Sequence, residues 1–294
     1  MAESTAHKFG QIIGELLELA LEPHLQKFAR KHKLFLDKKG ERKARSGKKV
    51  TWTDANNNKH DLDYVLERGG TENKIGIPVA FIESAWRRYT KHSRNKAQEI
   101  QSAVLPLATK YKSSSPFIGV VLAGVFTEGA LRQLKSLGFG VLYFPYESVV
   151  KAFAKFGINA AFEENTAEAD FRKKIESWNK LPNKENVAKE LLKLNKKGVD
   201  EFLISLSHSV SRFIERIIIL PLHGQENISN SVIEAIDFLK KYSEEKPKLP
   251  LSKYEIIIKY NTGDRIEASF KDKKDVIKFL ESYILKNNIR GFFL

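Results

Sequence analysis

The sequence predicts an α/β protein in which a parallel or mixed central sheet is flanked by helices. Strand-like and helix-like segments alternate as β-α-β-α-β-α between residues 75 and 157, which is typical of strands joined by crossover helices. The expected strands at 77–85, 117–126 and 139–144 are almost wholly apolar, as in strands covered on both faces. The expected helices of this region span 93–111, 128–137 and 148–156.

The N-terminal segments add a helix and two strands. Residues 5–31 have a wide apolar face at helical spacing, so we expect an amphipathic helix that Pro23 either kinks or divides. Residues 50–54 and 61–67 indicate two strands joined by a turn rich in asparagine. The basic segment 37–49 is interpreted either as a solvated, mobile loop or as a loop that grips phosphates.

Beyond about residue 165 the pattern changes to consecutive helices. The expected helices span 171–178, 184–194, 200–219 and 229–242. A linker at 247–250 precedes an expected hairpin at 253–270 and a closing helix at 273–285. We therefore expect three domains: a core at 1–165, a mainly helical region at 166–250, and a small ββα unit at 251–294.

The charge balance bears on the kind of partner. The 294 residues carry a formal net charge of +14, and the sequence pI is about 9.6. An excess of positive charge favours an anionic partner, with nucleic acid as the first expectation and a membrane surface as the second. The chain has no cysteine, which excludes disulfides, zinc sites with cysteine ligands and a thiol nucleophile. Because no signal peptide or membrane-spanning run is evident, we expect a cytoplasmic protein.

Two acidic residues stand in strand-like, apolar surroundings. Asp63 lies in the second expected strand, and Glu83 is the one charge within 77–85. Carboxylates on neighbouring strands can share a hard cation such as Mg²⁺, which takes oxygen ligands and leaves positions for water and phosphate oxygens. The alternative is that Asp63 faces solvent and that Glu83 is paired with an arginine. For Glu83 we favour a functional role, because an ionised carboxylate in a buried strand is costly without a strong partner.

A dense group of cations follows Glu83 directly. It consists of Arg87, Arg88, Lys91, His92, Arg94 and Lys96. Phosphate binding is the favoured interpretation, with a solvated helix face as the alternative. The sequence contains no glycine-rich Walker-type loop, no GxSxG and no HExxH, so it lacks the usual marks of a nucleotide-binding loop, a serine hydrolase and a zinc peptidase.

In the order of its elements and acidic residues, the chain resembles the PD-(D/E)XK nuclease superfamily, and type II restriction endonucleases in particular. The resemblance covers residues 5–157. Asp63 matches the motif aspartate, Glu83 the (D/E), and Glu15 the auxiliary carboxylate that some members carry on the first helix. Ala85 stands where the family has lysine, so Lys96 is the first candidate for that cation and Arg87 the second. Glu99 and Gln98 match helix positions that assist the metal or water in some relatives.

The resemblance implies a restriction-endonuclease-like fold and Mg²⁺-dependent hydrolysis of double-stranded DNA, often by a homodimer. In that interpretation Asp63, Glu83 and Glu15 hold the metal. The cations Arg88, Lys91, His92 and Arg94 bind DNA phosphates, and the region 166–250 serves DNA recognition or dimerisation. Two alternatives stay open: a nuclease-like fold that binds nucleic acid without cutting it, which Ala85 favours, and a structure-selective junction or repair nuclease.

Overall fold

The computed structural model describes residues 4–245 and 249–283, apart from the side chains of Lys91, His92 and Ser113. The chain divides into two compact units, residues 1–207 and 208–294. The first unit contains, in chain order, α1 (Thr5–Lys31), β1 (Leu34–Lys38), β2 (Val50–Thr53), β3 (Lys59–Leu62), β4 (Tyr64–Arg68), β5 (Ile77–Arg87), α2 (Thr90–Lys110), the short 3-10 helix η1 (Lys112–Ser114), β6 (Phe117–Gly124), α3 (Glu128–Ser136), β7 (Gly140–Pro145), α4 (Tyr146–Ala154), α5 (Glu168–Lys180), α6 (Glu185–Leu194) and most of α7 (Lys196–Val210).

The first unit is built on a mixed five-stranded sheet with the order β1-β4-β5-β6-β7. Neighbours are antiparallel from β1 to β5 and parallel from β5 to β7. This arrangement confirms the expected α/β class and the alternation between residues 75 and 157. The strand β6, which lies between β5 and β7, is buried along its whole length, because helices cover both faces of the sheet.

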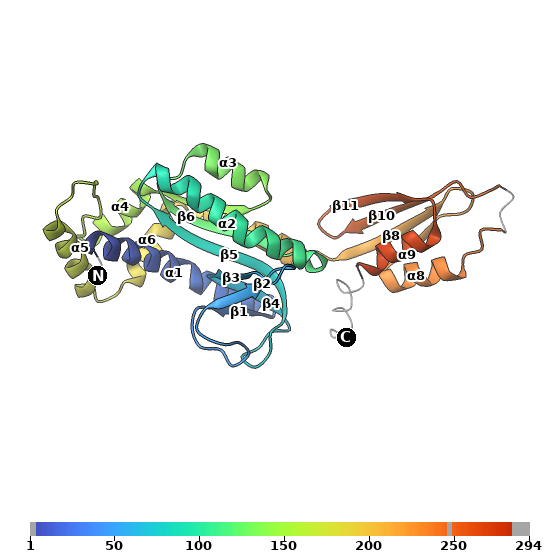
Figure 1. Cartoon of the computed structure of the whole chain (residues 1–294), viewed down its shortest axis with the longest axis horizontal. Coiled ribbons are helices and arrows are strands. Elements are labelled where there is room, and N and C mark those ends of the chain that lie inside the picture. The colour runs from blue at the N-terminus through green and yellow to red at the C-terminus, as the bar shows by residue number, and fades with distance from the viewer. Residues whose placement is uncertain (1–3, 246–248, 284–294) are drawn as a thin grey trace. The chain divides into compact units, whose positions relative to one another are not determined.

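Helices form a layer on each face of this sheet (Figure 1). The helices α2 and α3 cover one face, where they pack against β5 and β7. The helix α1 packs on β5, α4 packs on β6 and β7, and α6 packs on α1 and α4. The apolar face expected for residues 5–31 is the buried face of α1, and this helix continues through Pro23 without dividing.

Two details of the N-terminal strands differ from the expectation. The run 61–67 is not one strand: β3 ends at Leu62 and pairs with β2, whereas β4 begins at Tyr64 and joins the central sheet. Asp63 therefore lies at the point where the chain leaves one sheet and enters another. The strand β1 was not expected. It forms because the short apolar run of Leu34, Phe35 and Leu36 completes the sheet edge beside β4, a pairing that local sequence does not specify.

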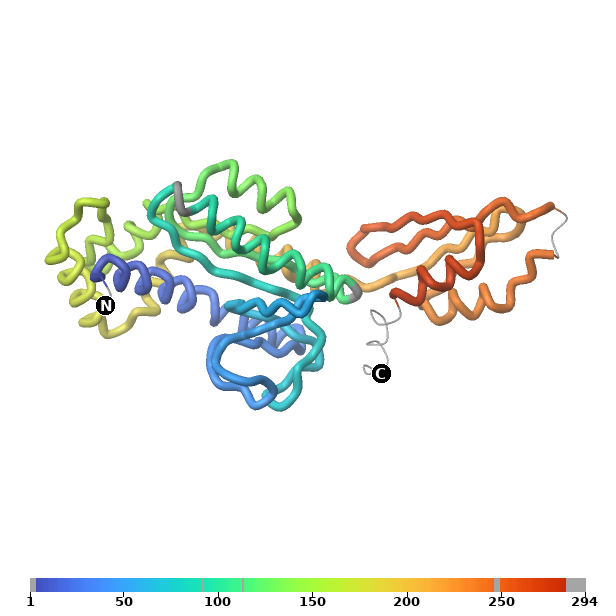
Figure 2. Tube along the Cα trace, in the orientation of Figure 1, coloured from blue at the N-terminus to red at the C-terminus, as the bar shows by residue number. Residues whose placement is uncertain are grey.

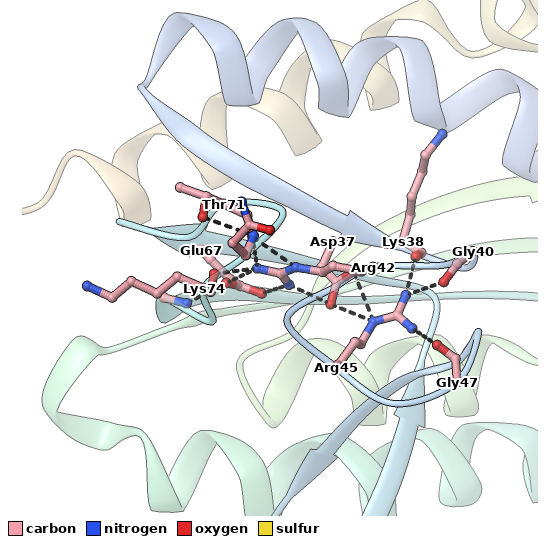
Figure 3. Close-up of polar contacts among 11 residues, drawn as sticks. Asp37, Lys38, Gly40, Arg42, Arg45, Gly47, Glu67, Thr71 and Lys74 are labelled. Atoms are coloured by element: carbon pink, nitrogen blue, oxygen red, sulfur yellow. Dashed lines mark hydrogen bonds and ion pairs between the residues drawn. The ribbon is translucent and has the colours of Figure 1, made fainter.

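The basic segment 37–49 is held in place by buried ion pairs and hydrogen bonds of its own arginines. The Arg42 guanidinium is bound in two places by the Glu67 carboxylate, at 2.6 and 3.0 Å, and lies 2.8 Å from Asp37 Oδ2. It also donates to the main-chain oxygens of Thr71 and Lys74 (Figure 3). Arg42, Asp37 and Glu67 are at most 5% exposed. We call these three side chains the ionic clasp.

The ionic clasp joins two loops that are distant in sequence. The loop after β1 lies beside the loop after β4 (Figure 2), and Ala44 donates a main-chain hydrogen bond to the Glu72 oxygen. Arg45 adds bonds to Asp37 and to the main-chain oxygens of Lys38, Gly40 and Gly47. Two arginines of the basic segment thus turn inward, and its lysines are left on the surface.

The second unit is a four-stranded antiparallel sheet with two helices. Its elements are β8 (Ile214–Pro221), β9 (Asn227–Ser229), α8 (Val232–Lys241), β10 (Tyr254–Tyr260), β11 (Arg265–Phe270) and α9 (Lys273–Glu281), and its strand order is β11-β10-β8-β9. The expected hairpin at 253–270 is confirmed. The expected closing helix is confirmed as far as Glu281, and its last two residues, with part of the linker at 247–250, lie outside the described residues.

The prediction of a helix at 200–219 is wrong for the second half of that segment. The helix α7 ends at Val210, and Ile214–Pro221 forms β8 instead. The run Ile217, Ile218, Ile219 is β-branched and therefore favours a strand, and pairing with β10 fixes it in the sheet.

The division into units also differs from the expected boundaries at 165 and 250. Helices α5 and α6 pack on α1, so they complete the first unit instead of starting a second domain. The expected ββα unit is joined by β10–β8 pairing to the segment before it, so its two strands form half of a larger sheet.

Candidate active site

Asp63 and Glu83 lie side by side across the β4–β5 pair. Tyr64 pairs with Ile82, and the Asp63 amide donates to Glu83 Oε1 at 3.2 Å. Asp63 Oδ2 in turn accepts from the amide and hydroxyl of Ser84, at 2.6 and 2.8 Å. Each carboxylate is thus held by one oxygen, and within the described residues its other oxygen accepts no hydrogen bond. The interruption between β3 and β4 therefore places the Asp63 carboxylate next to the Glu83 carboxylate.

The environment of Glu83 opposes its ionisation. Its side chain sits in the central sheet and the residue is 8% exposed. Burial, together with the charge of the Asp63 carboxylate, raises the pKa of Glu83 to about 8, and Lys96 acts in the opposite direction. Among the described side chains, Glu83 forms no ion pair with an arginine, which was the alternative to a functional role. A buried acid beside a second carboxylate is the kind of perturbed pair found at functional sites.

The stability of the metal-free protein should therefore fall as pH rises from about 5 to 8. Folded Glu83 keeps its proton up to about pH 8, whereas its ordinary value is 4.5. Its contribution to folding is fully present below 4.5 and is lost as pH rises through 8, by up to ~1.4 kcal/mol per pH unit. Urea unfolding at several pH values measures this slope. The Glu83→Gln variant should lack this pH dependence. If the unfolding free energies of the two proteins changed with pH in parallel, the raised pKa of Glu83 would be contradicted.

The helix α1 brings Glu18 to the site rather than Glu15. Glu18 is partly buried, and burial together with the charge of Asp63 raises its pKa, which Lys39 partly offsets. Glu15 is exposed and is not among the residues that line the adjacent pocket. Glu15 and Glu18 differ by only about 60° in direction around the helix, so the sequence carries no signal that separates them, and the packing of α1 on β5 decides which one reaches the site.

Asp63 lines a pocket of about 890 Å³ in the first unit, and Glu83 lies behind it, next to the lining residues Ser84 and Ala85 but not among them. The walls of the pocket come from α1, the end of β5, the start of α2 and the segment 162–171. Asp63, Glu18, Ser84, Arg87, Lys96 and Glu99 all line it. Residues from four separate stretches of the chain therefore converge at one concave place, as in a binding or active site.

Two of the expected cations reach this pocket. Lys96 forms an ion pair with Glu99 at 3.3 Å and is attracted by Glu83. Arg87 also lines the pocket and donates to the main-chain oxygen of Trp86. Ala85 is buried and lines the pocket as well, so the place where the family has lysine lies at the site but supplies no charge.

The remaining expected phosphate ligands are placed differently. Arg88 donates to the Phe162 oxygen at 2.9 Å and to Glu163 at 2.8 Å, and its guanidinium stacks on Tyr146. These contacts tie β5 to the segment after α4. Arg94 is exposed and is not among the lining residues. Lys91 and His92 lie in α2, and their side chains are outside the described part of the structure.

The acidic residues fit a hard divalent cation with few protein ligands. In the described part of the chain, no three His, Asp or Glu side chains cluster as a ready metal site. Mg²⁺, however, is commonly held by one or two carboxylates, with water and substrate phosphate oxygens completing its coordination. Among the described residues, Asp63 and Glu83 each offer one oxygen free of hydrogen bonds, and a bound cation would favour the ionised form of Glu83, whose pKa burial raises.

Comparisons with known proteins do not assign this site. No family model matches the sequence, and no curated protein matches it. A crystal structure of a protein of unknown function is similar at 11% sequence identity with a TM-score of 0.28, over 65% of this chain and 98% of that one. A similarity this low carries no argument about fold family or activity.

None of the helices formed by the described residues combines the length and the apolar character needed to cross a bilayer.

Proposed function

We propose that this protein is a Mg²⁺-dependent endonuclease of double-stranded DNA, with a restriction-endonuclease-like fold in its first unit. The observation that carries the proposal is the Asp63–Glu83 pair, joined by a 3.2 Å hydrogen bond and set beside a pocket with two cations, Lys96 and Arg87. The mixed sheet, with α1 before and α2 after the acidic strands, supports the finer fold assignment. The basic net charge of the chain supports a nucleic-acid substrate.

Each side chain has a role that its position allows. The free oxygens of Asp63 and Glu83 would hold the cation, with Glu18 close by. A bound divalent cation supplies charge stabilisation at the scissile phosphate and lowers the pKa of a water. Lys96 and Arg87 contribute positive charge where the phosphate becomes more negative. Ser84 positions Asp63 through two hydrogen bonds, and Glu99 orients Lys96.

The test is a cleavage assay on supercoiled plasmid and on long linear duplex DNA of known sequence, with Mg²⁺ or with EDTA. Discrete fragments that require Mg²⁺ are expected, and sequencing their ends would give the recognition site. Cutting confined to branched or nicked DNA would support the structure-selective alternative instead. Salt-sensitive binding with no product in Mg²⁺ or Mn²⁺ would replace the proposal with a non-catalytic binding protein, the alternative that the uncharged Ala85 favours.

Two glutamates on α1, Glu18 and Glu15, provide a test variant and a matched control variant for this site. Glu18→Gln should weaken cleavage or apparent Mg²⁺ affinity about 10- to 100-fold, the usual effect of losing a group that supports metal ligands. Glu15→Gln removes the same charge three residues away and should change either quantity less than ~2-fold, because Glu15 is exposed outside the pocket. Cleavage rates across a Mg²⁺ titration measure both. Equal losses in the two variants would remove Glu18 from the site.

The homodimer and the use of region 166–250 for DNA recognition stay predictions of the family resemblance. Sedimentation of the protein with and without a duplex would test the first of these.

A further inference from the structure

The sheet of the second unit has one covered face and one open face. The helices α8 and α9 pack on the covered face (Figure 1), where they enclose a core that includes Ile217, Ile219, Ile256 and Ile258. Along β10 buried and half-buried residues alternate, and the exposed residues of β11 alternate with half-buried ones. Because side chains on a strand point alternately to the two faces, the residues between the core positions form the open face.

Three cations lie in one row across the open face. Lys259 on β10 pairs with Arg265 on β11 and with Arg216 on β8. Arg216 and Arg265 are exposed, and Lys259 is half-buried. The row thus crosses three adjacent strands, which lie about 4.8 Å apart. We call these three residues the basic row.

Neighbouring acids neutralise the basic row only in part. Arg265 binds Glu267 at 3.0 Å. Arg216 and Lys259 have no ion-pair or hydrogen-bond partner for their side chains among the described residues. Like charges placed directly opposite each other on a sheet are destabilising. The folded unit therefore carries an electrostatic cost that an anion on this face would relieve.

An apolar row lies beside the basic row and completes the surface. Ile257 pairs with Ile218, and Ile218 pairs with Ile228. Ile228 is 50% exposed, and the other two are half-buried. Glu267 ends this row on β11, where it pairs with Ile257, and Glu255, at the next open-face position of β10, is paired with Lys253. The face therefore combines a line of positive charge with an apolar row that is bordered by two ion-paired acids. No aromatic side chain lies on the open-face positions of the described strands, so the face offers nothing for unstacked bases to stack on.

We propose that the open face of the second unit binds the sugar-phosphate backbone of duplex nucleic acid, with the basic row on the phosphates and the isoleucines against the sugars. Cations that contact phosphates position a protein on a duplex without reading its bases. The face thus adds a contact remote in sequence from the Asp63–Glu83 pair, and its binding does not require a metal or the proposed cleavage activity.

Binding of the full chain to a labelled 25-base-pair duplex, in EDTA and across a salt titration, tests the proposal. The triple variant Arg216→Gln/Lys259→Gln/Arg265→Gln should bind about 10-fold more weakly or worse at low salt, and the slope of log K against log salt should fall by about 2 to 3. The matched control Lys240→Gln/Lys274→Gln/Lys278→Gln removes the same charge from the exposed surfaces of α8 and α9 and should keep most of the slope. Unfolding curves of both variants show whether each is folded.

Three results would overturn the proposal. The first is unchanged duplex binding in the folded triple variant, and the second is an equal loss in the control. The third is a triple-variant defect for vesicles of anionic lipid or for polyglutamate, with duplex binding intact. Because the measurement is made in EDTA, it is separate from cleavage: a protein that fails to cut any DNA can still show this phosphate contact, and a nuclease can lack it.

Discussion

Replacing Glu83 with glutamine is expected to reduce Mg²⁺-dependent DNA cleavage about 1,000-fold or more. The change removes one of two carboxylates that would hold the cation, and a loss of ~4 kcal/mol of transition-state stabilisation corresponds to that factor. Glutamine keeps the size of the side chain and can still accept the hydrogen bond from the Asp63 amide. Single-turnover cleavage of a plasmid measures the effect, and Asp63→Asn should show a loss of similar size.

The stability of the same variant distinguishes a lost ligand from a damaged fold. Because burial raises the pKa of Glu83 to about 8, an uncharged glutamine should leave the metal-free protein as stable as before at about pH 4 and make it more stable at every pH above that, with the full difference reached by about pH 8. Added Mg²⁺ should raise the melting temperature of the original protein more at pH 8 than at pH 6, since the cation competes with a proton. Full activity in Glu83→Gln would rule out the proposed site.

Replacing Arg42 with methionine is expected to lower the free energy of unfolding of the first unit by about 3 to 5 kcal/mol, the usual cost of removing one partner from a buried ion pair. The change would leave the carboxylates of Asp37 and Glu67, which are 2% and 0% exposed, without their shared cation. It would also remove the hydrogen bonds from Arg42 to the loop oxygens of Thr71 and Lys74. Urea unfolding, followed at two probes because the chain has two units, measures the loss.

Two further variants test whether charge is the cause of this loss. Lys43→Met, on the exposed side of the same loop, should change stability by less than ~0.5 kcal/mol. Removing the carboxylates together with the arginine, in Asp37→Leu/Arg42→Met/Glu67→Leu, should recover part of the stability because no uncompensated charge stays buried. Recovery will be incomplete, since Glu67 also accepts the Gly76 amide at 2.6 Å. A stable Arg42→Met protein would show that the ionic clasp does not hold the loops.

The central sheet was predictable because its signals are local. The apolar runs that became β5, β6 and β7 are long enough and apolar enough to indicate buried strands, and the segments between them have helical spacing. The same reasoning identified the β10–β11 hairpin. It failed for β1 and β8, where partners distant in sequence, β4 and β10, decide the structure.

The candidate site was predictable only in part. Asp63 and Glu83 could be singled out because a charge in an apolar run is costly wherever the strand lies. The choice between Glu15 and Glu18 could not be made, because residues three apart on a helix differ by only about 60° in direction. The packing of α1 on β5 sets that rotation. For Arg42 and Arg88 the charge was visible in the sequence, but their buried or stacked partners are 25 and 74 residues away.

The sequence by itself therefore determined the α/β class, the order of the central strands along the chain and the two acidic residues that most need an explanation. These follow from burial and spacing within a few residues. Only the tertiary structure decided that β3 and β4 separate at Asp63, that Glu18 replaces Glu15 beside it, and that three cations form a row on the second sheet. Each of these depends on register or helix rotation, which are set by contacts between distant segments.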